Sequence, residues 1–216
     1  MAAGKLRRIN SAVVVAVIGA SAGLPVNSAS LVRDQVAVAK PNAFAPQLRD
    51  GDIVLRRGLD MMSRLVMTQG DAARFSHVGL IVVRHDTPFV IHAMPAEGER
   101  PGGAILEPLA TFMSAAEAAD VAIYRDTALS AAQRGAIRQA AFAQLGLPFD
   151  ERFQLSNTKK VYCTALVVRA YADAGIRLVD ERATIQVPLL PERVVPPDHI
   201  RRFPAIPLSL IASLSP

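Results

Sequence analysis

Residues 75–94 read FSHVGLIVVRHDTPFVIHAM, and this stretch determines the predicted architecture. Two runs rich in β-branched and aromatic residues, 77–83 and 88–94, are typical of β-strands. The polar residues 84–87 separate the two runs and favour a hairpin with a four-residue loop. We therefore expect an antiparallel sheet that extends outward from this hairpin.

The length of the loop sets the register of the hairpin. A four-residue loop pairs Val83 with Pro88. The same register places His92 opposite Gly79, and His77 is then the diagonal neighbour of His92 on the same face. Gly79 has no side chain, so it leaves room for both imidazoles.

Two histidines on one sheet face have three interpretations. They are a catalytic base with its orienting partner, two buried histidines with backbone partners, or two ligands of a metal ion. The metal site is the weaker hypothesis, because no third or fourth ligand lies nearby in the sequence. The other histidines, His85 in the loop and His199 beside a proline-rich segment, are expected at the surface.

Residues 163–175 read CTALVVRAYADAG and predict an amphipathic helix whose inward face includes Cys163. A free cysteine on such a face is most often a small buried hydrophobe. Cys163 also lies in the first turn, where unpaired backbone N–H groups and the helix dipole stabilise a thiolate or an oxyanion. It is the only cysteine, so the chain forms no intramolecular disulfide and any sulfur chemistry depends on this residue.

The remaining pattern has strands first and helices later, which predicts an α+β fold. Ser130 and Gln133 form a capping box before a helix that extends to Leu145. A proline-rich loop is expected over 188–197 and an uncharged apolar tail over 203–216. The other expected elements are strands at 52–57, 104–107 and 121–125 and a short methionine-rich helix at 59–67.

The N-terminal residues have the layout of a secretory signal peptide. Three cations precede a nine-residue apolar run, and an Ala-Ser-Ala cleavage motif ends at residue 22. The run is much shorter than a membrane span, and the alternative is a short buried or interfacial helix. We expect a signal peptide at 1–22, a linker at 23–47 and a domain at 48–216 with a proline-rich C-terminal extension, exported to the periplasm or cell envelope.

The charge gives little support for a nucleic-acid partner. The formal net charge is +5, but three cations and no acid lie in residues 1–22, so the remainder carries only +2. The basic pairs are scattered and are not interleaved with aromatic residues as in strand-binding surfaces. We therefore expect a solvated basic surface and no nucleic acid.

Four motifs together resemble those of the papain-like superfamily of NlpC-type cell-wall endopeptidases. Their order, with the histidine strand before the cysteine helix, is similar to the circularly permuted branch, which includes YiiX-like bacterial proteins and the lecithin retinol acyltransferase group. The resemblance covers roughly 48–175. The motifs are DGDIVLRRG at 50–58, FSHVGL at 75–80, GLPFD at 146–150 and YCTALV at 162–167.

This resemblance implies a cysteine hydrolase or acyltransferase in which a nucleophile-bearing helix packs on an antiparallel sheet. By position, Cys163 would be the nucleophile, His77 the general base and His92 the third polar residue. Tyr162 and Thr164 would support the oxyanion site, with packing an equal alternative for Tyr162. No cofactor or metal is implied.

The sequence departs from the family pattern at two positions. His92 stands where YiiX-like relatives tend to have an acid and where the acyltransferase group has a histidine. A neutral histidine orients the ring of His77 but supplies no counter-charge, so a thiolate–imidazolium pair is less favoured. Ala165 stands where relatives often have glutamate. Asp150 is interpreted as a turn or cap residue.

We therefore expect an exported cysteine hydrolase that cleaves an amide or ester through an acyl-enzyme. A cell-wall peptide amide is one expected substrate. A lipid ester or amide, with peripheral membrane contact, is the other. The apolar residues of 59–67 and the apolar tail favour it, with a place in the core as the alternative for both segments. The alternatives are a non-catalytic envelope protein that binds such ligands and a purely structural envelope protein.

Overall fold

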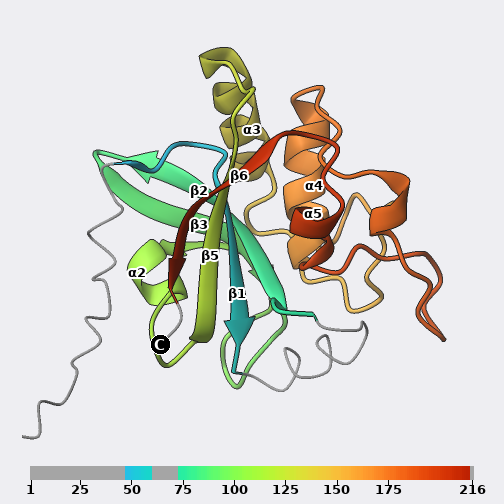
Figure 1. Ribbon diagram of the computed structural model, residues 1–216. Coiled ribbons are helices and arrows are strands. Elements are labelled where there is room, and N and C mark those ends of the chain that lie inside the picture. Colours follow the sequence, from blue (N-terminus) through green and yellow to red (C-terminus); the bar gives the residue numbers. More distant parts are fainter. Residues whose placement is uncertain (1–46, 60–72, 215–216) are drawn as a thin grey trace, which may run out of the picture. The chain divides into compact units, whose positions relative to one another are not determined.

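A six-stranded antiparallel sheet, in the order β4-β3-β2-β1-β5-β6, organises the described part of the chain. The computed structural model describes residues 47–59 and 73–214 (Figure 1). The predicted signal peptide and linker, and nearly all of the predicted helix at 59–67, lie outside these ranges. The strands are β1 (Ile53–Gly58), β2 (His77–Arg84), β3 (Thr87–Met94), β4 (Gly103–Pro108), β5 (Ala118–Asp126) and β6 (Leu208–Leu214).

The predicted hairpin is present as β2 and β3, with the predicted register. Val83 pairs with Pro88, but Arg84 also pairs with Thr87, so the turn has two residues rather than four. The turn residues are His85 and Asp86, both with positive φ (47° and 60°), as a type I′ turn requires. This turn matches the right-handed twist of the strands, so the register that aligns the two histidines is well defined.

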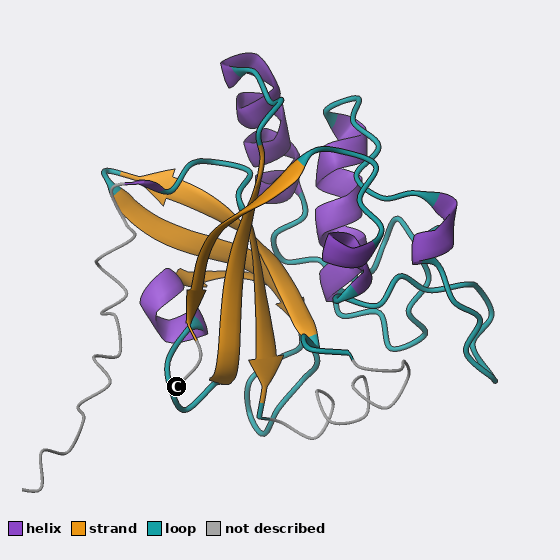
Figure 2. Cartoon of the chain, viewed as in Figure 1, coloured by secondary structure: helices purple, strands orange, loops and turns teal. Residues whose placement is uncertain are grey.

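Helices cover both faces of the sheet, and each face has its own core (Figure 2). Helices α3 and α4 pack on one face, where Ile137 and Leu166 meet Leu80 of β2. The short α2 packs on the other face, where Phe112 meets Ile81. The helical segments are α2 (Leu109–Phe112), α3 (Ala131–Ala143), α4 (Cys163–Asp173), η3 (Glu181–Ala183) and α5 (His199–Arg202).

The two predicted helices end where their glycines predict. The capping box at Ser130 and Gln133 is present at the start of α3. Gly146 and Gly175 adopt positive φ (81° and 75°) just beyond α3 and α4, which lets the chain leave each helix without strain. None of the helices in the described ranges is long and apolar enough to cross a membrane.

Two expectations for the C-terminal region are wrong. The segment expected as an apolar tail contains β6, an edge strand that pairs with β5 through contacts such as Ile123 with Ala212. His199 is buried rather than exposed: its Nδ1 lies 2.8 Å from the carbonyl oxygen of Ala183, and its ring packs against Phe203. Both features depend on contacts between segments that are far apart in the sequence, so short stretches of sequence do not predict them.

Polar contacts fix the position of α4 against the sheet. The hydroxyl of Tyr171, on α4, donates a 2.9 Å hydrogen bond to the carbonyl of Gly51, just before β1. The adjacent Asp52 is fully buried and binds Arg125 of β5 through two contacts of 2.7 and 2.6 Å. The start of β1 therefore connects β5 to the helix that carries the cysteine.

Candidate active site

Cys163 is the first residue of α4 and is only 8% exposed. Its Sγ lies 3.9 Å from Oγ1 of Thr164, and nearby backbone groups of Thr164, Val78 and Cys163 itself favour the ionised form of the thiol. Helix starts leave backbone N–H groups without intrahelical partners, and here such groups face sulfur. The sequence prediction of a cysteine at a helix start is confirmed.

The thiol occupies the place where β2 and β3 separate. In a two-residue hairpin the closing pair exchanges hydrogen bonds, and so does every second pair after it. The β2–β3 ladder ends at the pair of Leu80 with Ile91. If the ladder continued, Val78 would be the next residue of β2 to form backbone hydrogen bonds with β3. Its backbone faces the sulfur of Cys163 instead. The start of α4 thus meets β2 directly beside His77.

The two strand histidines are in direct contact, as the predicted register implies. Nε2 of His77 lies 2.8 Å from Nδ1 of His92, and the rings meet edge to face with centroids 5.0 Å apart. Gly79 makes this arrangement possible. A Cβ there would lie 2.4 Å from Cγ1 of Val90 and 3.1 Å from Cβ of His92.

Glu107, on β4, is a further polar partner that the sequence analysis missed. Its Oε1 lies 2.8 Å from Nε2 of His92, although the N–H direction is not aligned with the oxygen. The contact depends on the pairing of β3 with β4, in which His92 lies opposite Ile105 and Glu107 is two residues further on. The only signal in the sequence was an acid at the end of the predicted strand 104–107.

A buried arginine faces the histidine pair from β1. Arg56 pairs with His77 in the β1–β2 ladder and is 4% exposed. Its Nη1 donates to the carbonyl of Phe112 at 3.1 Å, and its Nη2 lies 3.4 Å from Glu117. The ring of Phe112 packs against both imidazoles, at 5.7 Å from His77 and 5.1 Å from His92. The imidazoles are therefore enclosed on the α2 face of the sheet.

The structure does not join the cysteine to the histidines by a hydrogen bond within residues 47–59 and 73–214. The side chain of Val78 belongs to the core that contains Cys163. The side chain of the preceding residue, His77, lies on the opposite face of the sheet, against Phe112. Cys163 and His77 therefore lie on the two sides of the sheet at the end of β2. Catalytic hydrogen bonds are often long in unliganded enzymes and shorten when substrate binds.

Comparison with known proteins identifies the family. A family model described as "Permuted papain-like amidase enzyme, YaeF/YiiX, C92 family" matches residues 47–193. The chain belongs to this family. It is 28% identical over 144 residues to YiiX of Escherichia coli (strain K12), a match that covers 65% of this chain and 66% of that protein.

The same fold is also found in a solved structure. A crystal structure described as metalloprotein yiiX from Escherichia coli O157:H7 has a TM-score of 0.64, with 24% identity. It covers 79% of this chain, and the match includes 99% of that structure. The predicted family and the predicted α+β fold are confirmed. In the part of the chain that the structure describes, no group of three or more His, Cys, Asp or Glu side chains is arranged to hold a metal.

Most of the ionisable groups at this site are neutral. Burial lowers the pKa of His77 well below its ordinary value, and the nearby Arg56 and His92 lower it further. Burial also raises the pKa of the Cys163 thiol, although contacts from Thr164 and backbone groups oppose it. Loss of hydration at the sulfur thus outweighs the favourable effect of the helix start. The resting pair is a thiol and a neutral imidazole.

His92 and Glu107 differ in charge. Burial lowers the pKa of His92, against the opposing effect of Glu107, so His92 is neutral at pH 7. Burial disfavours ionisation of Glu107, but contacts with His92, Arg56 and Arg100 outweigh it and lower the pKa of this carboxyl. The candidate site therefore holds a carboxylate next to two neutral imidazoles.

The remaining predicted residues differ in what they contact. The backbone and hydroxyl of Thr164 face the thiol. The side chain of Tyr162 turns away: its hydroxyl accepts from the backbone N–H of Val195 at 3.5 Å, and its ring packs 5.4 Å from Phe153. Asp150 accepts from the backbone N–H groups of neighbouring residues, which confirms its interpretation as a turn residue.

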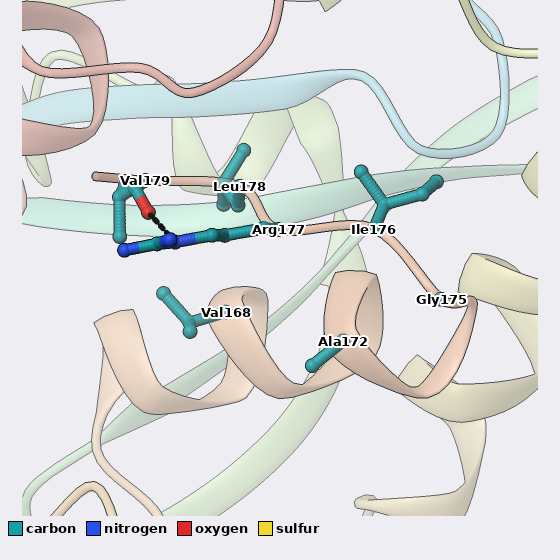
Figure 3. A pocket seen from close by; sticks show the side chains of 7 residues that line it. All are labelled: Val168, Ala172, Gly175, Ile176, Arg177, Leu178 and Val179. Carbon is teal, nitrogen blue, oxygen red and sulfur yellow. Dashed lines mark hydrogen bonds between the residues drawn. The ribbon is translucent and has the colours of Figure 1, made fainter. Parts of the chain in front are cut away.

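A separate pocket of about 280 Å³ lies along the second half of α4 (Figure 3). It is lined mainly by apolar side chains, with Val168 and Ala172 on α4. These residues follow Cys163 by five and nine positions, about 8 and 14 Å along the helix axis. The pocket therefore contributes nothing to the thiol site.

Proposed function

We propose that the protein is an exported cysteine amidase that cleaves an amide bond of a cell-wall peptide through an acyl-enzyme on Cys163. The observation that carries the proposal is the position of the thiol. Sγ lies at a helix start and faces the backbone of Val78, the residue next to a buried histidine pair. A nucleophile, a base and backbone hydrogen-bond donors are the groups that acyl transfer requires.

The neutral resting state defines the first chemical step. As Sγ of Cys163 attacks the amide carbonyl, His77 takes the thiol proton, so no free thiolate accumulates in the buried site. Backbone N–H groups near Sγ then stabilise the negative charge on the former carbonyl oxygen. The protonated His77 gives its proton to the leaving nitrogen, and the C–N bond breaks to form a thioester.

In the second half of the reaction, hydrolysis of the thioester, these roles are reversed. His77 removes a proton from water, and the resulting hydroxide attacks the thioester carbonyl. The C–S bond breaks, and the sulfur regains a proton from His77. His92 orients His77 throughout, since the two rings are 2.8 Å apart through Nε2 and Nδ1. The products are a carboxylic acid and an amine, and the enzyme returns to its starting state.

Two lines support the choice of substrate and location. The family is one of amidases, which supports an amide bond as the target. Residues 1–22 have the cation-rich start, apolar run and small-residue motif of a signal peptide, which supports action in the periplasm or cell envelope. Peptide stems of the cell wall are the abundant amides in that compartment, and we propose no nucleic-acid partner.

A lipid acyl hydrolase or acyltransferase is the second candidate. The favouring observation is His92, which contacts His77 where the acyltransferase relatives also have a histidine. In this case the thioester would carry a fatty acyl group, and peripheral contact with a membrane would supply the substrate. The first half of the mechanism is the same for both candidates.

Intact-mass measurement of the acyl-enzyme tests the proposal. The protein is mixed with cell-wall peptide fragments or with phospholipid vesicles, quenched in acid and digested to locate any added mass. We expect an adduct on Cys163 with the peptide fragments, no adduct in Cys163→Ala, and slower formation in His77→Ala. An adduct only with lipid would favour the second candidate. Fragment binding that is equal in wild type and Cys163→Ala, without adduct or product, would indicate a binding protein and overturn the proposal.

A further inference from the structure

We propose that Glu107 is a positioning residue that sets the proton arrangement of the histidine pair, so that Nδ1 of His77 is the basic nitrogen. The inference rests on the proposed function, because it assigns a role within the same site. It begins from two contacts in series. Nε2 of His77 lies 2.8 Å from Nδ1 of His92, and Nε2 of His92 lies 2.8 Å from Oε1 of Glu107.

The carboxylate determines where His92 carries its proton. A neutral imidazole has one N–H donor and one bare nitrogen. A bare lone pair 2.8 Å from a carboxylate oxygen would be repelled, whereas an N–H dipole there is attracted, even without linear alignment. His92 is buried and neutral, so its proton resides on Nε2 and its Nδ1 is bare.

The arrangement of His92 then determines that of His77. A bare Nδ1 on His92 can only accept a hydrogen bond, so Nε2 of His77 must donate it. His77 is also neutral, because burial and Arg56 lower its pKa. Its remaining nitrogen, Nδ1, is therefore unprotonated and available as a base. Without the carboxylate, His92 could donate from Nδ1, and the proton of His77 would then occupy the nitrogen that is needed for catalysis.

Glu107 also supplies the negative charge that His92 itself lacks. When His77 takes the thiol proton it becomes cationic in a buried site that already holds the guanidinium of Arg56. The charged groups that face the pair are Arg56 from β1, Glu107 from β4 and Glu117 after α2, with Arg100 acting on Glu107. Glu117 contacts Arg56 and not His92. Glu107 is thus the carboxylate coupled to His77 through hydrogen-bonding atoms, as the acid of a catalytic triad is coupled to its histidine.

Three adjacent strands hold the series in place. His77 lies on β2, His92 on β3 and Glu107 on β4, and these strands are neighbours in the sheet. Side chains that alternate on a sheet face have fixed directions, so the contacts do not depend on a flexible loop. The departure from the family pattern at His92 is therefore compensated one strand further along.

The test compares three substitutions in the full-length protein. Glu107→Gln removes the charge but keeps an oxygen acceptor, Glu107→Leu removes both, and Glu117→Gln is the matched control for a nearby carboxylate. Two properties are measured: the tautomers of both imidazoles by 15N NMR, and the pH profiles of kcat and KM for the substrate that acylates Cys163. The NMR readout would not respond to a purely structural role.

In wild type we expect both rings to carry the proton on Nε2. Glu107→Gln should lower kcat about 10- to 100-fold with KM nearly unchanged. The loss should not exceed the full contribution of a general base to the rate, because Glu107 acts only through His77. Glu107→Leu should lower kcat further and change the tautomer of His92. In a His92→Asn background, Glu107→Gln should add no further loss, because the coupling path is broken. Glu117→Gln removes a charge that acts on Arg56, so it should lower kcat less than Glu107→Gln and leave both tautomers unchanged.

Wild-type tautomers in Glu107→Leu, together with a kcat in Glu107→Gln equal to that of the Glu117→Gln control, would overturn the inference. Glu107→Gln preserves size and an acceptor, so it decides the outcome even where the leucine variant does not fold. Failure of the proposed function looks different: wild type would form no adduct on Cys163, while the NMR spectra would still report whether Glu107 sets the tautomers.

Discussion

His77 and His92, fifteen residues apart in the chain, share a 2.8 Å contact between Nε2 and Nδ1. Both side chains are buried, and both are neutral because burial lowers their pKa values. One consequence concerns reactivity, since a neutral His77 keeps an unprotonated ring nitrogen for the reaction but does not hold Cys163 as a thiolate. Another concerns stability, since neither ring accepts a proton easily while the protein is folded.

The rate of alkylation of Cys163 should rise only at an unusually high pH. Burial raises the pKa of this thiol above its ordinary range, so the thiolate appears only in alkaline solution. We expect the iodoacetamide rate to rise with a midpoint above about 8.5. Because Cys163 is the only cysteine, mass spectrometry of the whole protein reports it directly. A midpoint near neutral pH that His77→Ala abolishes would instead show a preformed thiolate–imidazolium pair.

Folding stability should decrease in mild acid because of the same histidines. Their folded-state pKa values are lowered, so below the ordinary value of about 6.5 the unfolded chain binds protons that the folded chain does not. This contribution is fully present above that pH and is lost as the pH falls toward the folded-state values. Urea midpoints at pH 7.5 and 5.0 measure it. The difference should shrink in His77→Asn, and an unchanged difference would assign the effect to other groups.

Gly79→Ala should destabilise the protein and disturb His92. The new Cβ would lie 2.4 Å from Cγ1 of Val90, so strand β3 must shift. We expect a loss of about 1–3 kcal/mol in the free energy of unfolding, as for other overpacked cores. Gly135→Ala is the matched control, because a Cβ there meets nothing within 4 Å and α3 should gain up to about 1 kcal/mol. Equal effects in the two variants would contradict the close approach at Gly79.

Asp52→Asn should strongly destabilise the fold. The fully buried carboxylate makes two contacts with Arg125, whose side chain is 12% exposed, so the substitution leaves a guanidinium without its counter-charge. We expect about 3–5 kcal/mol of lost stability in urea unfolding. The exposed pair of Asp180 with Arg182 provides the comparison, and Asp180→Asn should cause no measurable change. A similar loss in both variants would contradict the role of burial.

Tyr162→Phe separates packing from catalysis. The hydroxyl contacts the backbone N–H of Val195 at 3.5 Å, and the ring packs against Phe153. We expect a loss of about 1 kcal/mol in stability and unchanged kcat. A large fall in kcat with KM preserved would instead show that the hydroxyl moves to stabilise the oxyanion.

Local sequence predicted the features that depend on short stretches of chain. The register of the hairpin follows from its loop and brings His92 beside Gly79, where an added Cβ would lie 3.1 Å from Cβ of His92. The first residue of α4 was predicted as well. Glu107 was missed because its contact requires β4 to pair with β3 after an intervening segment. Similarly, β6 is recognisable only through its pairing with β5.

The sign of the change in the pKa of Cys163 was also beyond local sequence. The helix start and the neighbouring N–H groups were predicted, and they do favour the thiolate. Their effect is smaller than that of burial, which depends on how Val78 and the rest of the core enclose the sulfur. Sequence identified the donors but not the hydration that the sulfur loses.

The two-residue turn at His85 and Asp86 has a consequence far from the thiol. A strand has a side-chain period of two, so a one-residue slip of β3 along β2 would move every side chain of β3 to the opposite face. His92 would then point into the core of α4, away from His77. The geometry of the proton path thus depends on a solvent-exposed bend that fixes this register, although the bend contains none of the residues that take part.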